Sequence, residues 1–159
     1  MTAFSSAAFG AEYVREGWPG EGTPRLTASK DELVIHKMHD TSSETRRLKY
    51  KAGWLIVWDQ SKLITRKSAS WTVKREISKG SCGTLYPGTQ VALLQFETQG
   101  WATFRVEDKI CSLKATRSSD FDKADEWPRV EWWVRVLDNS KSPIGWLLVE
   151  AKQVDLLLQ

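Results

Sequence analysis

Short runs of strand-forming residues, about ten residues apart, constrain this fold more than any other feature of the sequence. Residues 33–36 form one such run, and residues 71–77 alternate apolar and polar side chains as a half-buried strand does. No segment keeps apolar residues at helical spacing over a dozen positions. We therefore predict an all-β protein. The other predicted strands are residues 54–58, 63–65, 90–96, 101–106, 109–113, 131–137, 144–149 and 154–157.

The amino-acid composition is that of a folded globular protein. The chain has 159 residues, of which 41% are hydrophobic and 27% charged, as in folded globular domains. Its net charge of +3 is too mild for a dedicated nucleic-acid binder, so no nucleic-acid partner is expected. No apolar stretch approaches the roughly 20 residues that a membrane helix needs, and we expect no membrane span.

The two cysteines are Cys82 and Cys111. There is no C-x-x-C pair and no cluster of histidine and cysteine at zinc spacing, so neither a metal nor another cofactor is predicted. A disulfide between the two residues would close a loop of about 30 residues. Two buried free thiols are the alternative, and the sequence leaves both open.

The first eleven residues bear on the compartment. They are small and apolar, and Ala8-Phe9-Gly10 resembles the cleavage site at the end of a signal sequence, although no basic segment precedes it. We expect an exported, periplasmic protein. A cytoplasmic protein with a leader of no function is the alternative.

Glycine, proline and charged residues mark the organisation of the chain. Residues 1–27 are predicted to form an extended N-terminal arm, because five glycines and prolines fall between positions 17 and 24. Residues 115–128 are mostly polar and are predicted to form a solvated loop inserted between strands.

A set of glycine and tryptophan motifs in the second half resembles a known family. The motifs are Leu85-x-x-Gly88-x-x-Val91, Gly100-Trp101, Trp133-Val134-Arg135-Val136, Gly145-Trp146-Leu147 and a closing Val154-x-Leu156. In this order they resemble the bacterial SH3-like (SH3b) domains. Each Gly-Trp pair lets a tight turn place a large ring on the next strand. The resemblance implies a small SH3-like barrel and a recognition function.

The first half contains a fainter copy of the same pattern. Residues 33–35 are followed by Leu48, Gly53 and Ile56-Val57, which repeat the opening step of such a domain. We therefore predict two SH3-like barrels in tandem, residues 28–78 and 79–159, the second carrying the insert at 115–128. A single elaborated barrel with an N-terminal arm and a hairpin is the alternative.

No motif for catalysis is present, and no catalytic residue is predicted. The only imidazoles are His36 and His39, and no nucleophile signature surrounds either cysteine. The acidic pairs at 107–108 and 125–126 fall in predicted turns, where they would be solvated. The basic cluster at 46–51 is expected to be a solvated edge.

The nine tryptophans are the best candidates for binding. Because a small barrel core holds only about three or four of them, several must be partly exposed. Trp132 and Trp133 are adjacent on one strand and point to opposite faces. Trp132 shares its face with Val134, so Trp133 is predicted to face outward, stacked with Arg135. Packing of the Trp133 ring against the companion barrel is the alternative.

Two further tryptophans complete the candidate site. Trp127, followed by Pro128, is expected to line a groove for an extended peptide. Trp58 is expected to share one strand face with Trp54. The predicted ligand-binding residues are thus Trp58, Trp127, Trp133 and Arg135.

The sequence supports two hypotheses of function. The first is a non-catalytic recognition module that binds a peptide, a cell-wall fragment or a protein partner through exposed aromatic side chains. The second is a structural or assembly subunit, whose surplus tryptophans are buried between barrels or protomers. The oligomeric state is left open.

Overall fold

The structure is a computed structural model that describes residues 11–115 and 118–157. Strands dominate these residues, and the only helices among them are two 3-10 turns of three residues, η1 (Thr98–Gly100) and η2 (Ser118–Asp120). The predicted all-β class is therefore confirmed. The described strands are β1 (Tyr13–Glu16), β2 (Arg25–Ala28), β3 (Glu32–His36), β4 (Thr45–Lys49), β5 (Trp58–Lys67), β6 (Ala69–Val73), β7 (Gln90–Phe96), β8 (Trp101–Val106), β9 (Lys109–Lys114), β10 (Phe121–Lys123), β11 (Arg129–Leu137), β12 (Pro143–Leu148) and β13 (Val154–Leu157).

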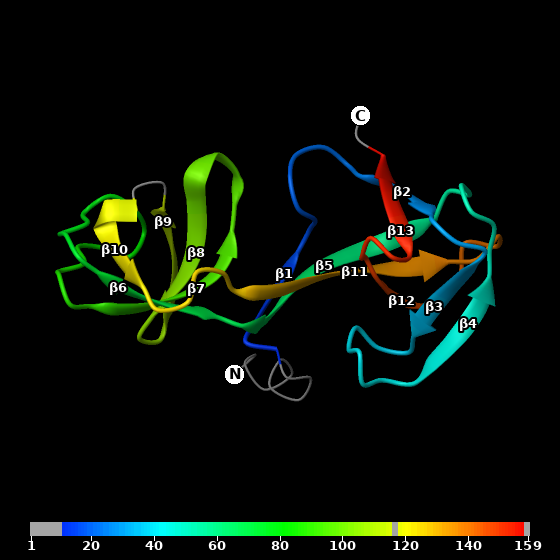
Figure 1. The fold of residues 1–159 in the computed structure, drawn as a ribbon, viewed down its shortest axis with the longest axis horizontal. Helices are drawn as coiled ribbons and strands as arrows, with labels where there is room; N and C mark the ends of the chain where they lie inside the picture. The colour runs from blue at the N-terminus through cyan, green and yellow to red at the C-terminus, as the bar shows by residue number, and fades with distance from the viewer. Residues whose placement is uncertain (1–10, 116–117, 158–159) are drawn as a thin grey trace. The chain divides into compact units, whose positions relative to one another are not determined.

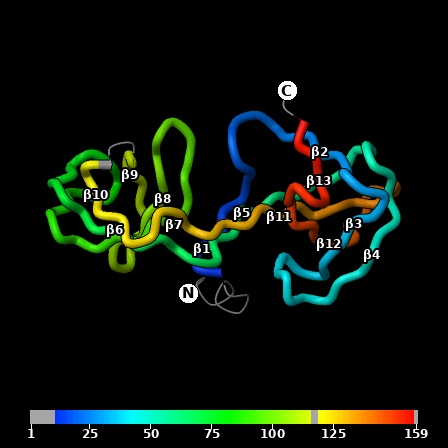
Figure 2. The backbone as a smooth tube through the Cα atoms, in the orientation of Figure 1, coloured from blue at the N-terminus to red at the C-terminus, as the bar shows by residue number. Residues whose placement is uncertain are grey.

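The chain forms two compact units, each made of two segments that alternate along the sequence. Unit 1 comprises Met1–Tyr13 and Thr65–Val130, and unit 2 comprises Val14–Ile64 and Glu131–Gln159. The chain passes from one unit to the other within β1, β5 and β11, as the colour sequence in Figure 2 shows. Because the segments of the two units alternate, their borders do not coincide with the expected tandem segments 28–78 and 79–159.

Unit 1 is built on a five-stranded antiparallel sheet with the order β10-β6-β7-β8-β9 (Figure 1). Alternate residues of its strands point into one core, where the Trp71 ring lies 5.1 Å from Phe121 and 5.6 Å from Phe104. This core consists of Ala69, Trp71, Val73, Leu85, Val91, Leu93, Ala102, Phe104, Leu113 and Phe121.

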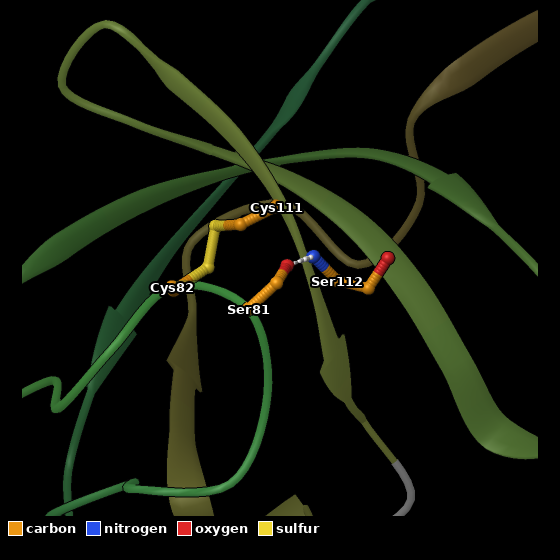
Figure 3. Close-up of a disulfide and its surroundings, with 4 residues drawn as sticks. All are labelled: Ser81, Cys82, Cys111 and Ser112. Carbon is orange, nitrogen blue, oxygen red and sulfur yellow. Dashed lines mark hydrogen bonds between the residues drawn. A yellow bond between two sulfur atoms is a disulfide. The ribbon is translucent and has the colours of Figure 1, made fainter.

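A disulfide between Cys82 and Cys111 attaches the segment before β7 to β9 (Figure 3). The Ser112 amide donates to Ser81 Oγ at 2.8 Å, and the Ser81 amide donates to the Ser112 carbonyl at 3.1 Å. Gly80 has φ +135°, and a Cβ there would lie 2.5 Å from the Ser112 carbonyl oxygen. Glycine thus allows the approach that brings the two cysteines together.

Unit 2 contains a six-stranded sheet of order β1-β5-β11-β12-β3-β4 and a two-stranded sheet, β13-β2. Both contribute to one apolar core, which consists of Leu26, Ala28, Leu33, Ile35, Ile56, Val134, Val136, Leu147 and Val154. The sheets of both units are open, and none of those in the described ranges closes into a barrel.

Several expected elements have different bounds. The strand expected at 54–58 begins only at Trp58 and continues to Lys67, because residues 53–56 instead bond to β2: the Ile56 amide donates to the Leu26 carbonyl at 2.8 Å. The expected arm at 1–27 contains β1 and β2, and its residues 1–10 lie outside the described part. The insert at 115–128 is not simply a solvated loop. It contains β10, whose Phe121 is buried in the core of unit 1.

The motifs behind the SH3b resemblance are divided between the two units. Leu85, Gly88, Val91 and the pair Gly100-Trp101 belong to unit 1, whereas residues 133–136, 145–147 and 154–156 belong to unit 2. The tight turn expected at a Gly-Trp pair is formed at Gly100, which has φ +78° and ends η1 directly before β8. At position 145 the glycine instead lies within β12 and allows close packing. Gly145 has φ +145°, and a Cβ there would lie 2.3 Å from Ile35 Cγ2. None of the helices in the described residues has the length and apolar character needed to cross a membrane.

Candidate functional site

The four residues predicted to bind ligand do not gather at one place within a unit. Trp58, Trp133 and Arg135 belong to unit 2, whereas Trp127 belongs to unit 1. We therefore describe the surroundings of each residue in turn.

Trp133 does not face solvent, so the prediction of an outward ring at this position is wrong. Its side chain is 0% exposed, its ring meets that of His36 edge-on at 5.1 Å, and its indole N–H donates to Glu131 Oε1 at 3.1 Å. The strand alternation itself holds, since Val134 and Val136 belong to the core as expected. The error has a different cause: β11 lies inside the sheet, and both of its faces are covered there.

Trp132, expected in the core, is only half-buried at its edge. Its indole N–H donates to Ser61 Oγ at 2.7 Å, which satisfies the polar end of the ring. Neither Trp132 nor Trp133 is therefore an open surface for a ligand.

Arg135 forms an ion pair instead of stacking on Trp133. Its Nε donates to Asp59 Oδ1 at 2.9 Å, and its Nη2 donates to Oδ2 of the same carboxylate. The hydrogen bond from Arg135 lowers the pKa of Asp59 below its usual 3.8. In the described residues, the cations that lie over tryptophan rings are lysines, such as Lys62 over Trp146 at 5.9 Å. Arg135 thus has its fork of donors occupied within the protein.

Trp127 is exposed, as predicted. Its side chain is 69% exposed, and its ring lies 5.3 Å from that of Phe96 with the two planes 58° apart. Phe96, at the end of β7, is itself 39% exposed. The two rings form a small apolar surface on unit 1. The best-formed cavities of the described residues are lined by residues of unit 2, so the groove expected next to Trp127 and Pro128 stays a prediction.

Trp58 lines a groove on unit 2, which we call the Trp18–Trp58 groove. The two indole rings meet edge to face, with centroids 5.8 Å apart. The groove has a volume of about 380 Å³. It is lined by Trp18, Thr23, Pro24, Arg25, Leu26, Leu55, Ile56, Val57 and Trp58. Trp54, which was expected to share the face of Trp58, instead meets Tyr50 edge-on at 6.1 Å.

A glycine-rich loop supplies one wall of the groove. Residues 17–24 connect β1 to β2, and Gly17, Gly20 and Gly22 all have positive φ, which allows the tight path of this segment. The Gly17 amide donates to the Ser61 carbonyl at 2.9 Å, and Ser61 Oγ donates to the Gly17 carbonyl at 2.6 Å. These bonds hold the start of the loop on β5, so Trp18 lies against Trp58.

The pairing of β2 with residues 53–57 supplies the rest of the groove. Thr27 lies opposite Leu55. The neighbouring residues Leu26 and Ile56 point to the other face, into the core, where both are buried. Leu55 and Val57 therefore point outward and are 45% and 42% exposed. The outward side chains of Leu55 and Val57 are thus held by backbone hydrogen bonds between β2 and residues 53–56.

Arg25 is the charged side chain of this lining. It is exposed, and in the described residues its guanidinium is not recorded in an ion pair or a side-chain hydrogen bond. The groove is therefore apolar with a single positive group among its described residues.

The residues that were considered for catalysis have structural surroundings. His36 is buried against Trp133, and the ring of His39 meets Trp146 edge-on at 5.0 Å. The sulfurs of Cys82 and Cys111 are bonded to each other, so the protein as described offers no thiol nucleophile. No group of three potential metal ligands is found in the described part of the chain.

Sequence reasoning missed Trp18, Pro24 and Arg25. All three fall in the predicted extended arm, because the glycines and prolines around them break regular structure. The available signal was Trp18-Pro19 itself, since a large aromatic residue inside a glycine-rich loop often has a contact that holds it.

Comparison of the chain with protein-family models, with curated proteins and with solved structures finds no match to any of them.

Proposed function

We propose that this chain is a non-catalytic recognition module that binds an extended peptide segment, free or as part of a partner protein, in the Trp18–Trp58 groove. The observation that carries the proposal is the groove itself: about 380 Å³ lined by two indole rings in edge contact, Pro24 and outward-facing Leu55 and Val57. Grooves with aromatic and proline walls suit extended chains, whose side chains insert between rigid rings.

The exposure of large apolar groups around the groove supports binding. Val57 and Leu55 lie in the lining, and Leu157 pairs with Arg25 at its margin while 45% exposed. Removing such area from water contributes about 25 cal/mol per Å². Side chains that are rigid before binding lose little entropy when a ligand covers them. Trp18 and Trp58 already contact each other, so these two rings need little ordering when a ligand binds.

We also propose that the units are divergent SH3-like modules. Two features support this: short antiparallel strands around one core in each unit, and positive-φ glycines directly before Trp101 and Trp146. Recognition through exposed aromatic side chains is what this resemblance implies.

An exported, periplasmic location is part of the same proposal. The Cys82–Cys111 disulfide supports it, because such bonds persist in oxidising compartments and are rare in reducing ones. Fractionation of the native host would test the location, and an unbound pair of thiols in protein isolated from the cytoplasm would contradict it.

A second function, as an assembly subunit, is favoured by different residues. Trp71, Trp133 and Trp146 are buried, whereas Trp54 is 58% exposed and lies outside the groove lining. Leu156, at 48% exposed, adds to the apolar surface of unit 2. Self-association that Trp54→Ala abolishes, measured by sedimentation, would favour this role.

Peptide selection tests the proposed function directly. Random nine-residue peptides displayed on phage should be enriched by the purified protein, and Trp58→Ala and Trp18→Ala should each lose the enriched phage. Trp127→Ala is the matched control, because it removes an exposed indole from the other unit and should keep binding. Loss of binding by Trp127→Ala alone would move the site to the Phe96–Trp127 surface. Failure to enrich any peptide, with capture of soluble cell-wall fragments instead, would contradict peptide recognition.

A further inference from the structure

We infer that the segment bound in the Trp18–Trp58 groove carries an acidic side chain next to apolar ones, and that Arg25 pairs with its carboxylate. This inference rests on the proposed function and goes beyond it by naming the chemistry of the ligand. It starts from the place of Arg25 in the small sheet of unit 2.

Arg25 lies between two exposed apolar side chains. In the β13-β2 pair, Leu157 is the partner of Arg25 across the ladder. On the other side of β2, Thr27 faces Leu55, and the same antiparallel register places Val57 opposite Arg25. Side chains opposite each other in neighbouring strands share a face. Leu157, Arg25 and Val57 therefore form one row on the outward face, while Leu26 points into the core.

The N–H groups of the Arg25 guanidinium make no ion pair or side-chain hydrogen bond with the described residues. Other arginines of unit 2 use theirs within the protein: Arg46 Nη2 donates to the Ile144 carbonyl at 3.0 Å, and Arg135 holds Asp59. Asp155 lies diagonally across the ladder from Arg25 on the same face, but it pairs with Thr27 and forms no ion pair with Arg25.

The groove therefore complements a negative charge. Its described lining contains Arg25 and no acidic residue. The planar fork of an arginine matches a carboxylate with two parallel hydrogen bonds. Val57 and Leu157, on either side, would exclude water once a ligand covers them, and an ion pair is stronger where water is excluded.

The position of Arg25 also determines which residues should flank the acidic residue in the bound segment. Arg25 lines the same groove as Trp18, Trp58 and Val57, so the neighbours of the carboxylate in the ligand meet aromatic and aliphatic surfaces. A polyanionic segment would leave its other charges against these apolar side chains. The expected ligand is thus an extended segment with one acidic residue flanked by aromatic or aliphatic residues.

Peptide selection with charge reversal tests this inference. Random nine-residue peptides on phage are selected on the wild type and, separately, on Arg25→Glu. We expect wild-type selection to fix Asp or Glu at one position beside apolar residues, and Arg25→Glu to fix Lys or Arg at that position. Arg75→Glu, which reverses an exposed charge in unit 1, is the matched control and should select the wild-type consensus.

Synthetic peptides then give the size of the effect. The best selected peptide is compared with variants that carry Gln or Lys in place of its acidic residue, by fluorescence anisotropy. For the wild type, replacement by Gln should weaken binding about tenfold, the loss typical of one charge-assisted pair. For Arg25→Glu, the Lys peptide should bind more tightly than the acidic one. Circular dichroism of each variant checks that the exposed substitution leaves the fold intact.

The outcomes separate the inference from the proposed function. Peptides that bind the wild type and Arg25→Glu equally, and that Trp58→Ala loses, would overturn the role of Arg25 and leave groove recognition standing. A consensus without an acidic position would do the same. Peptides that Trp58→Ala retains, or no enrichment at all, would overturn the proposed function and this inference with it.

Discussion

Arg135 and Asp59 face each other across β11 and β5, and the guanidinium of Arg135 holds both carboxylate oxygens of Asp59. The pair is partly exposed, with side chains 29% and 36% accessible. The hydrogen bond to Arg135 lowers the pKa of Asp59, and the same bond raises the pKa of Arg135. A residue expected to bind ligand thus links two neighbouring strands of the sheet instead.

The lowered pKa of Asp59 predicts how stability depends on pH. Because the folded state favours the ionised carboxylate, the pair stabilises the protein above the unfolded value of 3.8 and loses this effect as the pH falls through the lowered folded value. Asp59→Asn should therefore lower the free energy of unfolding at neutral pH, by at most about 1 kcal/mol for so exposed a pair. Urea unfolding of both proteins from pH 7 down to strongly acidic solution measures the difference, which should vanish in acid.

Asp108→Asn is the control for this prediction. Asp108 lies in the exposed turn between β8 and β9, and its replacement should leave stability nearly unchanged. If the free energies of unfolding of Asp59→Asn and the wild type differ by the same amount down to strong acid, lost packing and not ionisation is the cause.

Burial of Trp133 predicts a structural role. Trp133→Ala should destabilise unit 2 by about 3–5 kcal/mol, because it removes a fully buried indole and leaves a cavity against His36. Trp127→Ala, which removes an indole that is 69% exposed, should change stability by less than about 1 kcal/mol. Thermal and urea unfolding followed by circular dichroism compare the two. Equal stability of Trp133→Ala and the wild type would refute the burial of this ring.

Exposure also predicts how the tryptophan fluorescence responds to iodide. Trp54 and Trp127 are exposed and should be quenched, whereas Trp71, Trp133 and Trp146 are at most 8% exposed and should be shielded. Trp127→Phe should remove part of the accessible signal, and Trp71→Phe should remove part of the inaccessible signal. Quenching of the Trp71 signal together with shielding of the Trp127 signal would contradict the burial of Trp71 in the core of unit 1.

The disulfide should stabilise the protein mainly through the unfolded chain. Cys82 and Cys111 are 29 positions apart, and closing a loop of this size contributes roughly 2–4 kcal/mol. The double variant Cys82→Ser, Cys111→Ser should unfold at correspondingly lower urea concentration than the wild type. Addition of reductant should lower the stability of the wild type alone, and an equal response of the double variant would exclude the disulfide as its cause.

The class of the fold could be predicted because strand signals are local. Residues 90–96, 101–106 and 154–157 have the predicted bounds, since alternation and turn residues are properties of neighbouring positions. The alternation of the two units along the chain could not be predicted, because it depends on which strands pair. β5 pairs with β11, more than 60 positions later in the chain, and no local pattern records such a partner.

The candidate site could be predicted only in part. Trp127 and Trp58 were found because a surplus of large rings must leave some exposed. Trp133 was misplaced because alternation separates the two faces of a strand but does not say whether a second layer covers the outer one. Arg25 and Trp18 were missed because their loop and strand acquire a role only through contacts with Trp58 and Val57.

Gly145 offers a test of how closely β12 packs against β3. A Cβ at this position would lie 2.3 Å from Ile35 Cγ2 and 2.8 Å from the His36 carbonyl oxygen, and φ is +145°. Gly145→Ala should therefore destabilise unit 2 by about 2–5 kcal/mol, through backbone strain and overpacking together. Gly53→Ala is the matched control: its φ of +90° imposes similar strain, but a Cβ there meets nothing within 4 Å, so the loss should stay near 1–2 kcal/mol. Urea unfolding of both variants measures the difference, and equal losses would show that the contact between Gly145 and β3 is looser than described.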